Sequence, residues 1–389
     1  MYSISNFQQL MKGLPHGTVA EFVTKHNADK YSKRFRHWDH LMAMLYAQLS
    51  GASSLRAVES GFNSHQAHHY HLRTTPIKRS TLADANERRS DTVFTHIATW
   101  LMGKVSRQLR RDSGDLMYLL DSTSLTLKGR EFDRWTAENR TRNTQGIKLH
   151  VLFDADQEAP VWHSMTAANV NDITEAIGMP LIAGATYVCD KGYNDYNWWH
   201  SIDQAGAQFV TRFKRNASIR VIEQRIIPTE VADVILADEL VTFNCKRPGG
   251  GRINHYHGKP LRRVTVHRPG KDRPIVLATN DLHSTAMQIA QRYKDRWGIE
   301  LFFKWVKQHL QIKQFLGRSP NAVRIQVLTA LISYLLIALY KQKHAPTTSM
   351  WECLCQIRYA LFQRPEIERV ARCKRLVQEW EAPKQRNLF

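Results

Sequence analysis

Hydrophobic residues recur with a helical period in the first and last parts of this 389-residue chain. From Trp38 to Leu49 they follow the spacing of a helix face, and the run stops at Ser50-Gly51, where glycine favours a helix end. Further helices are predicted from about Ser54 and after Pro76, so we expect residues 1–114 to be helical. Residues 320–389 are also predicted to be helical to near residue 382, before a frayed basic tail.

The period changes to that of strands in the middle of the chain. Residues 116–127, 147–156 and 159–168 are apolar runs rich in strand formers. A helix from Ile173, a strand at 186–190, a helix at 195–206 and a strand at 207–214 follow. Strands followed by a helix–strand alternation predict a mixed α/β sheet.

A basic segment interrupts this alternation. Residues 215–273 contain short alternating runs and the sequence KRPGGGR, which predict a mainly β insertion, and residues 274–280 resume a core strand. We therefore expect a helical N-terminal region (1–114), an α/β core in two parts (115–214 and 274–319) around the insertion (215–273), and a helical C-terminal region (320–389).

The helix predicted at residues 293–307 carries its charges on one face. A step of about 100° per residue places Tyr293, Arg296, Glu300 and Lys307 in one sector. Apolar residues fill a separate sector: Ile299, Phe302, Phe303, Val306 and Leu310. One face can therefore pack into a core while the other presents a carboxylate among two cations and a phenol.

The charge balance indicates a polyanionic partner. The chain has 55 Lys and Arg residues against 35 Asp and Glu residues, a net charge of +20. Residues 116–211 are nevertheless acidic, with 7 basic and 12 acidic residues, and residues 212–273 are basic, with 14 against 6. An acidic centre between basic segments suits a metal-binding site surrounded by phosphate-binding surfaces.

Cysteine usage and the apolar runs favour a cytoplasmic protein. The five cysteines lack a paired spacing, which argues for a reducing compartment, and the first residues do not resemble a signal peptide. Polar residues interrupt the most apolar run, Val327 to Tyr340, which is shorter than the ~20 residues of a membrane span. We expect a buried helix there and no membrane partner.

Three carboxylates from distant segments could converge on a metal. Asp121 and Asp190 are predicted at the ends of apolar strands, at the rim of the sheet, and Glu300 lies on the charged helix face. Oxygen ligands without Cys or His suit Mg²⁺ or Mn²⁺, and two such ions can catalyse phosphoryl transfer. Taken singly, each aspartate could equally be a turn or helix cap, and Glu300 could pair with Lys304.

The N-terminal helices weakly resemble a helix-turn-helix. On that interpretation four basic residues lie near DNA phosphates: Lys78, Arg79, Arg88 and Arg89. The alternative is an ordinary helical bundle with solvated charges. The histidines 65, 68, 69 and 71 lack the spacing of a metal site, and we interpret them as polar loop or DNA-facing residues.

Several other residues have an ordinary structural interpretation. We expect His150 and Asp172 to make structural hydrogen bonds near the core strands, with a role behind the metal ligands as the alternative, and Cys353 and Cys355 to be core residues. Trp297 and Lys304 border the charged face, where contact with DNA and packing or solvent exposure remain open.

The spacing Tyr293-x2-Arg296-x3-Glu300-x6-Lys307 matches the Y-R-E-K signature of DDE transposases of the insertion sequence 4 family. The segments LLDSTSL and VCDKGYND resemble that family's two aspartate motifs. The resemblance covers roughly residues 115–320. It implies an RNase H-like catalytic core interrupted by a β insertion, in a bacterial, nucleoid-associated enzyme.

The resemblance also implies a mechanism. Asp121, Asp190 and Glu300 would bind two Mg²⁺ ions, with Mn²⁺ as a substitute, while Tyr293, Arg296 and Lys307 would contact phosphates. Such an enzyme cuts double-stranded DNA at terminal inverted repeats and joins the freed 3′-OH to target DNA. Relatives act as dimers on paired ends.

One departure concerns the DNA hairpin that some relatives form. They stack a flipped base on a tryptophan of the insertion, and no tryptophan occurs here between Trp199 and Trp297. Phe243 or Tyr256 could offer a stacking face, although a β-core role is the simpler expectation. Two alternative functions stay open: an inactive, transposase-derived DNA-binding protein, and a metal-dependent nuclease on the same fold.

Overall fold

A computed structural model describes residues 4–109, 116–139 and 144–364 of the chain. The chain divides into two compact units, one of Met1–Leu101 with Val306–Phe389 and one of Met102–Trp305. We call them the helical unit and the sheet unit. The predicted basic tail and Cys373 lie outside the described residues.

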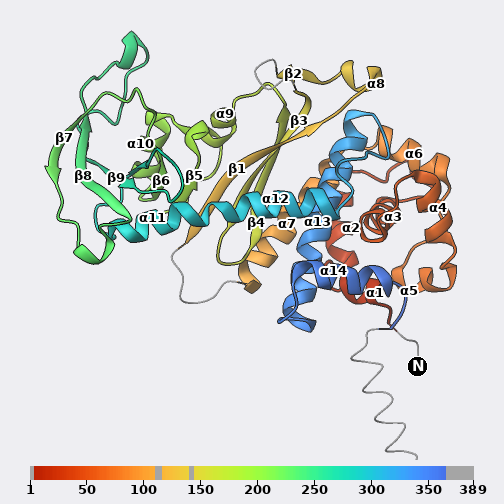
Figure 1. The fold of residues 1–389 in the computed structure, drawn as a ribbon. Coiled ribbons are helices and arrows are strands. Elements are labelled where there is room, and N and C mark those ends of the chain that lie inside the picture. The colour runs from red at the N-terminus through yellow and green to blue at the C-terminus, as the bar shows by residue number, and fades with distance from the viewer. Residues whose placement is uncertain (1–3, 110–115, 140–143, 365–389) are drawn as a thin grey trace, which may run out of the picture. The chain divides into compact units, whose positions relative to one another are not determined.

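The sheet unit is built on one mixed ten-stranded sheet with the order β2-β3-β1-β5-β6-β10-β9-β8-β7, and with β4 paired to β3 (Figure 1). Strands β4, β3 and β1 are antiparallel neighbours, whereas β1, β5 and β6 run parallel. This is the RNase H-like arrangement that the sequence predicted. The core strands are β1 (Met117–Thr126), β2 (Ala137–Asn139), β3 (Thr144–Asp154), β4 (Ala159–Ala167), β5 (Thr186–Cys189) and β6 (Gln208–Arg212).

The β-rich segment predicted as an insertion extends the same sheet. Its strands are β7 (Ile219–Gln224), β8 (Ile235–Phe243) and β9 (Leu261–Val266), and β10 (Ile275–Thr279) joins β9 to β6 by antiparallel pairing. The backbone hydrogen bonds of the core therefore continue into these strands. The domain boundaries at residues 215 and 273 stay a prediction.

Helices cover both faces of the core sheet. Helices α9 (Asp172–Ile177) and α10 (Tyr196–Gln204) share a hydrophobic core with Leu120 and Tyr187. On the other face, α12 (Trp297–His309) follows α11 (Ala286–Asp295), and Phe302 packs on Phe153 of β3 with ring centroids 5.0 Å apart. A Cβ at Gly298 would lie 3.3 Å from Leu119 Cδ1, so the glycine permits this close approach.

The single helix predicted at residues 293–307 is divided at Arg296. Helix α11 ends at Asp295 and α12 begins at Trp297, and Arg296 caps α11 while keeping right-handed helical angles (φ −50°, ψ −27°). The amide of Ile299 bonds to Arg296 O, a shorter turn than an α-helix makes. Figure 1 shows the two helices as one nearly continuous run along the sheet.

The helical unit confirms the N-terminal helices that the sequence predicted. Helix α3 (His37–Ser50) ends at Gly51, whose φ of +76° suits glycine, and α4 (Leu55–Asn63) begins after the capping side chain of Ser54. The unit's other helices are α1 (Asn6–Met11), α2 (His16–Lys25), α5 (His69–Leu72), α6 (Arg79–Arg88), α13 (Pro320–His344) and α14 (Met350–Tyr359). Helix α7 (Thr92–Leu109) connects the two units in the chain, and the short α8 (Arg130–Asp133) belongs to the sheet unit.

Helix α13 is the buried helix predicted from the apolar run, but it is longer than that run. It has 25 residues and is long and apolar enough to cross a membrane, with a mean hydropathy of 2.0 in its most apolar window. That window is 89% buried within the protein. The hydroxyls of Thr329 and Ser333 donate to carbonyls one helical turn earlier, which satisfies these polar groups inside the core.

Candidate active site

Two predicted metal ligands lie side by side at the end of a parallel strand pair. The pairing of β1 with β5 ends at Leu120 and Cys189, and Asp121 and Asp190 are the next residues of the two strands. Side chains alternate along a strand, so both aspartates face α12, on the side opposite to α9 and α10. Parallel register therefore brings together two carboxylates that are far apart in sequence.

The prediction that Asp121 ends its strand is wrong. Strand β1 continues to Thr126, because residues 121–126 remain paired with β3 after β5 has stopped. The backbone of Asp121 thus pairs with β3 on one edge of the strand. On the other edge β5 no longer pairs with it, and the next residue of that chain segment is Asp190. The functional consequence is the one expected of a strand end, a carboxylate on rigid backbone at the rim of the parallel pair.

Backbone amides orient both carboxylates. The amide of Ser122 donates to Asp121 Oδ1 at 2.8 Å, and the amide of Gly192 donates to Asp190 Oδ1 at 2.6 Å. Asp190 also caps the short 3₁₀ turn that follows, so the helix-cap interpretation and the metal-ligand interpretation apply to one residue. A Cβ at Gly192 would lie 2.8 Å from Asp190 Oδ1, so the glycine makes room for this carboxylate.

Arg296 connects the third predicted carboxylate to the first. Its Nη2 lies 2.5 Å from Glu300 Oε1, and its Nη1 lies 3.8 Å from Asp121 Oδ2. Glu300 therefore pairs with the cation one turn earlier in the chain, and the side chain of Lys304, the alternative partner, is exposed. The Arg296 guanidinium therefore contacts one carboxylate from the sheet, Asp121, and one from helix α12, Glu300.

The carboxylate cluster changes the acidity of Asp121. Burial raises its pKa to about 6, and the negative charges of Asp190 and Glu300 act in the same direction. The Ser122 amide and Arg296 oppose that rise. Such an excess of nearby carboxylates is typical of a site that gains a cation.

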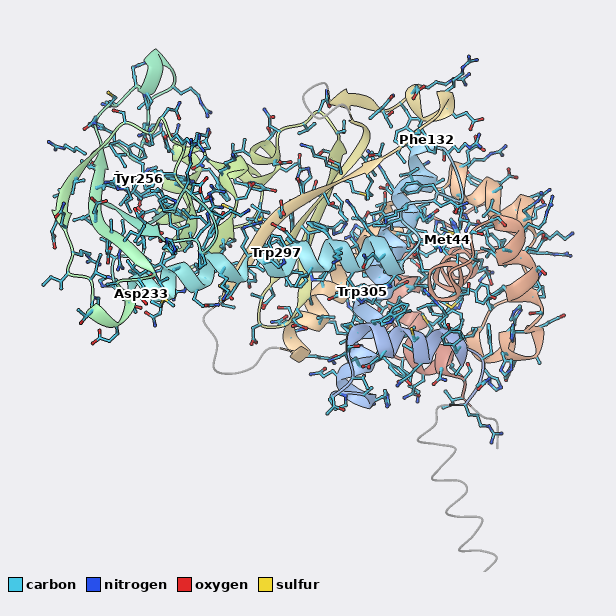
Figure 2. The ribbon with its side chains drawn as sticks, in the orientation of Figure 1. Met44, Phe132, Asp233, Tyr256, Trp297 and Trp305 are labelled. Carbon is cyan, nitrogen blue, oxygen red and sulfur yellow. The ribbon has the colours of Figure 1, made fainter. Side chains whose placement is uncertain are left out.

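The other residues of the predicted phosphate-binding face differ in their surroundings. The guanidinium of Arg296 lies over the ring of Tyr293, 5.7 Å from its centroid, and burial raises the pKa of that phenol. Trp297 is 58% exposed, and its label in Figure 2 lies on the helical run of α11 and α12. Lys307 lies in the part of α12 that belongs to the helical unit, where burial and Lys313 lower its pKa.

The chemical type of the candidate ligands supports a metal site, whereas their present arrangement does not form a complete one. Among the residues that the structure describes, no three His, Cys, Asp or Glu side chains stand close enough to hold an ion together. Arg296 supplies positive charge between Asp121 and Glu300 instead. The three carboxylates nevertheless offer only oxygen donors, which fits a hard divalent cation.

A cavity of about 1000 Å³ opens beside Tyr293 and Arg296. Four further basic side chains line it: Arg212, Arg268, Lys271 and Lys294. Asp233, Met287 and Trp297 also contribute to its wall. The sequence predicted a basic insertion but not which of its residues line a cavity with Tyr293 and Arg296.

The basic residues predicted at the N-terminal DNA surface are not equivalent. Lys78, Arg79 and Arg88 are exposed on or beside α6. Arg89 is half-buried, donates to Phe35 O and lies over the Phe35 ring at 5.2 Å. The contacts of Arg89 thus hold the helical unit together, and the role of the other three stays a prediction.

The histidine cluster has structural contacts in part. His69 is buried and its Nε2 bonds to Phe62 O at 3.0 Å, whereas His65 stacks on Phe362 with ring centroids 4.1 Å apart. The expectation of a loop or DNA-facing residue is therefore wrong for His69, which packs inside the helical unit.

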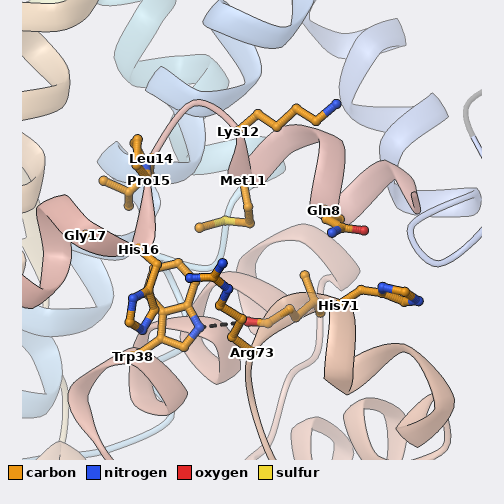
Figure 3. A pocket seen from close by; sticks show the side chains of 11 residues that line it. Gln8, Met11, Lys12, Leu14, Pro15, His16, Gly17, Trp38, His71 and Arg73 are labelled. Carbon is orange, nitrogen blue, oxygen red and sulfur yellow. Dashed lines mark hydrogen bonds between the residues drawn. The ribbon is translucent and has the colours of Figure 1, made fainter. Parts of the chain in front are cut away.

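A second basic cavity of about 370 Å³ lies in the helical unit (Figure 3). Lys12, His16, His71 and Arg73 contribute to it, and Trp38 forms part of its wall while donating to Leu72 O at 2.8 Å. The lining residues in this part of the described chain include no carboxylate.

The candidate stacking residues of the insertion belong to the core. Phe243 is 2% exposed and Tyr256 is 1% exposed, and both pack in the cluster around Trp199 (Figure 2 labels Tyr256). The simpler expectation of a core role is thus confirmed for both. Cys353 is buried as well, and Cys355 is half-buried.

Sequence reasoning did not identify Ser122 and Lys148 as parts of the site. Lys148 is buried on β3 and donates to Asp172 at 2.9 Å, and Ser122 donates to the same carboxylate at 2.8 Å. Asp172 therefore makes the structural hydrogen bonds expected of it. The sequence feature that could have pointed to this group is Lys148, a lysine within an otherwise apolar strand.

Comparison with known proteins shows the family of this chain. A sequence model described as the transposase DDE domain matches residues 112–336, more than half of the chain. The chain belongs to the transposase DDE domain family. This DDE transposase is thus an enzyme of DNA recombination that depends on divalent metal. A second model, for a domain of unknown function (DUF4372), matches residues 3–73.

Similar proteins carry transposase names. A Sinorhizobium fredii protein named as a transposase, y4zB, is 38% identical over 75% of this chain and 79% of its own length. A Geobacillus stearothermophilus protein named for insertion sequence element IS5377 is 27% identical over 66% of this chain and 65% of its own. Among solved structures, the piggyBac transposase synaptic complex with hairpin DNA aligns over 98% of this chain and 83% of that chain, with 12% identity and a TM-score of 0.49.

Proposed function

We propose that this DDE transposase mobilises a bacterial insertion sequence of the insertion sequence 4 type by cutting its ends and joining the 3′-OH to target DNA. The observation that supports the proposal is the position of Asp121 beside Asp190, together with the guanidinium of Arg296 that contacts both Asp121 and Glu300. The two aspartates follow the last paired residues of adjacent parallel strands.

The three carboxylates are the residues that would hold two Mg²⁺ ions, with Mn²⁺ as a substitute. Bound there, the ions supply activation of the attacking oxygen and stabilisation of the leaving oxygen in phosphoryl transfer. The protein holds Asp121 and Asp190 through the amides of Ser122 and Gly192, so these carboxylates keep their orientation before DNA arrives.

Cations beside the carboxylates would bind the DNA backbone. Arg296 can exchange its carboxylate partners for phosphate oxygens, because a guanidinium binds either anion through the same pair of N–H groups. Tyr293 can donate its phenolic proton to a phosphate, and we carry over a phosphate contact for Lys307 from the family signature alone. The basic wall of the adjoining cavity supports passage of a DNA strand next to this face.

We infer the partners from the same chemistry. The substrates are double-stranded DNA with terminal inverted repeats and a target duplex, held partly by exposed Lys78, Arg79 and Arg88 of the helical N-terminal region. A homodimer on paired ends, as in relatives of the family, would place one active site at each end. The protein would act in the cytoplasm, at the bacterial nucleoid.

A strand-transfer assay with Mg²⁺ on DNA carrying the terminal inverted repeats tests the proposal. Joined products are expected. Cleavage without joining would instead identify a nuclease on this fold, and retarded but uncut DNA would identify a DNA-binding protein without activity. Denaturing gels of the cleaved ends would also reveal a hairpin, which runs at twice the strand length after denaturation.

Glu300→Gln provides the decisive variant. It removes the carboxylate charge that would hold metal but keeps the shape of the side chain, so cleavage should fall by at least about a hundredfold while end binding stays intact. Glu230→Gln, at an exposed residue of the β-rich segment, is the matched control and should cleave normally. Equal loss of binding and cleavage in Glu300→Gln would contradict the assignment.

A further inference from the structure

A polar network lies behind Asp121, on the opposite face of the sheet. Side chains alternate along β1, so Asp121 faces α12 whereas Ser122 faces α9. His150 is directly opposite Ser122 on β3, and Lys148 lies two residues away on the same face. Asp172 reaches this group from the first residue of α9.

Asp172 is the centre of the network. Its Oδ1 accepts from Ser122 Oγ at 2.8 Å and from Lys148 Nζ at 2.9 Å, and Lys148 also donates to Val170 O at 2.6 Å. His150 Nδ1 lies 4.0 Å from the same oxygen. The network thus joins two neighbouring strands to the start of α9.

Burial makes these contacts costly to break. The side chain of Lys148 is 4% exposed and that of Asp172 is 14% exposed. A buried ammonium is unfavourable unless an anion and further acceptors compensate it, and Asp172 with Val170 O provides both. Lys148 therefore fixes Asp172, and Asp172 fixes the hydroxyl of Ser122.

Ser122 links Asp172 on one face of the sheet to Asp121 on the other face. Its side chain is bound on the α9 face, while its backbone amide donates to Asp121 Oδ1 at 2.8 Å. Asp172 also lies near the turn that follows Asp190, because a Cβ placed on Gly192 would lie 3.9 Å from Asp172 Oδ2. The network consequently holds the residue whose amide orients Asp121.

We propose that Asp172, anchored by Lys148, is a positioning residue that orients Asp121 for metal binding through Ser122. This rests on the proposed role of Asp121 as a metal ligand. Residues that orient a metal ligand from behind typically alter metal affinity or activity by 10–100-fold when they are replaced. Asp172 need not touch metal or DNA for this effect.

The test compares two variants at position 122 whose new side chains are isosteric with each other. Ser122→Val and Ser122→Thr have the same shape and both favour strands, but threonine alone keeps the hydroxyl that Asp172 accepts. Mn²⁺ binding to the DNA-free full-length protein is measured by electron paramagnetic resonance, together with the Mg²⁺ concentration at half-maximal cleavage. We expect Ser122→Val to weaken Mn²⁺ binding by about tenfold. Ser122→Thr should restore most of that loss.

Asp172→Asn provides the second arm. It should weaken Mn²⁺ binding about as much as Ser122→Val, and the double variant should be no weaker than either single variant, because all three break one chain of contacts. If Asp172→Asn does not fold, the Ser122 pair still decides. Unchanged Mn²⁺ affinity in Ser122→Val, or equal losses in the valine and threonine variants, would overturn the inference.

Failure of the inference is distinguishable from failure of the proposed function. Asp121→Asn should abolish both Mn²⁺ binding and cleavage if Asp121 is a metal ligand. If that variant keeps both, the proposed site itself is wrong. If Asp121→Asn loses both while Ser122→Val matches the wild type, the site stands and the positioning role of Asp172 falls.

Discussion

Replacement of Arg296 by glutamine removes the positive charge between Asp121 and Glu300. The guanidinium lies 2.5 Å from Glu300 and 3.8 Å from Asp121, and its own side chain is 13% exposed. Without it, Asp121, Asp190 and Glu300 repel one another with less compensation. We expect the metal-free variant to be less stable than the wild type, and added Mg²⁺ to restore much of the difference.

The magnitude follows from the exposure of the partners. Unit charges 4 Å apart attract by about 4 kcal/mol at an effective dielectric constant of about 20. Glu300 is 32% exposed and Asp121 is 22% exposed, so water screens part of this attraction and the desolvation of Arg296 opposes it. A loss of about 1–2 kcal/mol in the free energy of unfolding is therefore expected without metal.

Urea denaturation in EDTA and in saturating MgCl₂ measures the effect. A cation that binds only the folded state stabilises it by about 2.7 kcal/mol at a hundred times its dissociation constant. The variant should gain more than the wild type from Mg²⁺, because Arg296 no longer competes for the carboxylates. Lys304→Gln, which removes an exposed cation from the neighbouring helix α12, is the matched control.

Two results would refute this reasoning. Equal unfolding free energies for the wild type and Arg296→Gln in EDTA would mean that Arg296 does not compensate the carboxylates. An equal deficit with and without Mg²⁺ would mean that Arg296 stabilises the fold for reasons unrelated to the metal site.

Two further predictions concern residues that support the site. Gly192→Ala places a methyl group 2.8 Å from Asp190 Oδ1, so cleavage should fall at least about tenfold with DNA binding retained, and unchanged cleavage would mean that Asp190 can move freely. Asp281 precedes α11. Burial would raise its pKa, but hydrogen bonds from Ser284, His283 and Arg292 hold the pKa at about 2. Asp281→Asn should therefore cost about 2 kcal/mol of unfolding free energy above about pH 4.5, in a difference that shrinks as pH falls below about 4, and a pH-independent difference would contradict the charge effect.

Local pattern determined most of the elements of this protein. The helical period from Trp38 to Leu49 with its glycine stop predicted α3, and the apolar run in the C-terminal region predicted α13, because burial of one residue class at a fixed spacing is a local property. Strand-forming runs likewise predicted β1, β3, β4, β5 and β6 in order. The sequence also predicted the three carboxylates as candidates, since motif spacing is visible along the chain.

Only the tertiary structure decided how these residues meet. The register of β1 with β5 brings Asp121 beside Asp190, and the longer pairing of β1 with β3 places Asp121 inside a strand rather than at its end. The choice of Arg296 over Lys304 as the partner of Glu300 depends on which side of the helix faces the sheet. Pairing between distant strands is a long-range property that no local spacing encodes.

The same reason explains the network behind Asp121. Ser122, Lys148 and Asp172 come from two strands and a helix, and their contacts exist because β1 pairs with β3 in one register and α9 begins beside them. A lysine in an apolar strand was visible in the sequence, but its partner was not. The sequence by itself therefore determined which side chains are candidates for catalysis in this transposase, and strand register and helix packing decided which of them lie together.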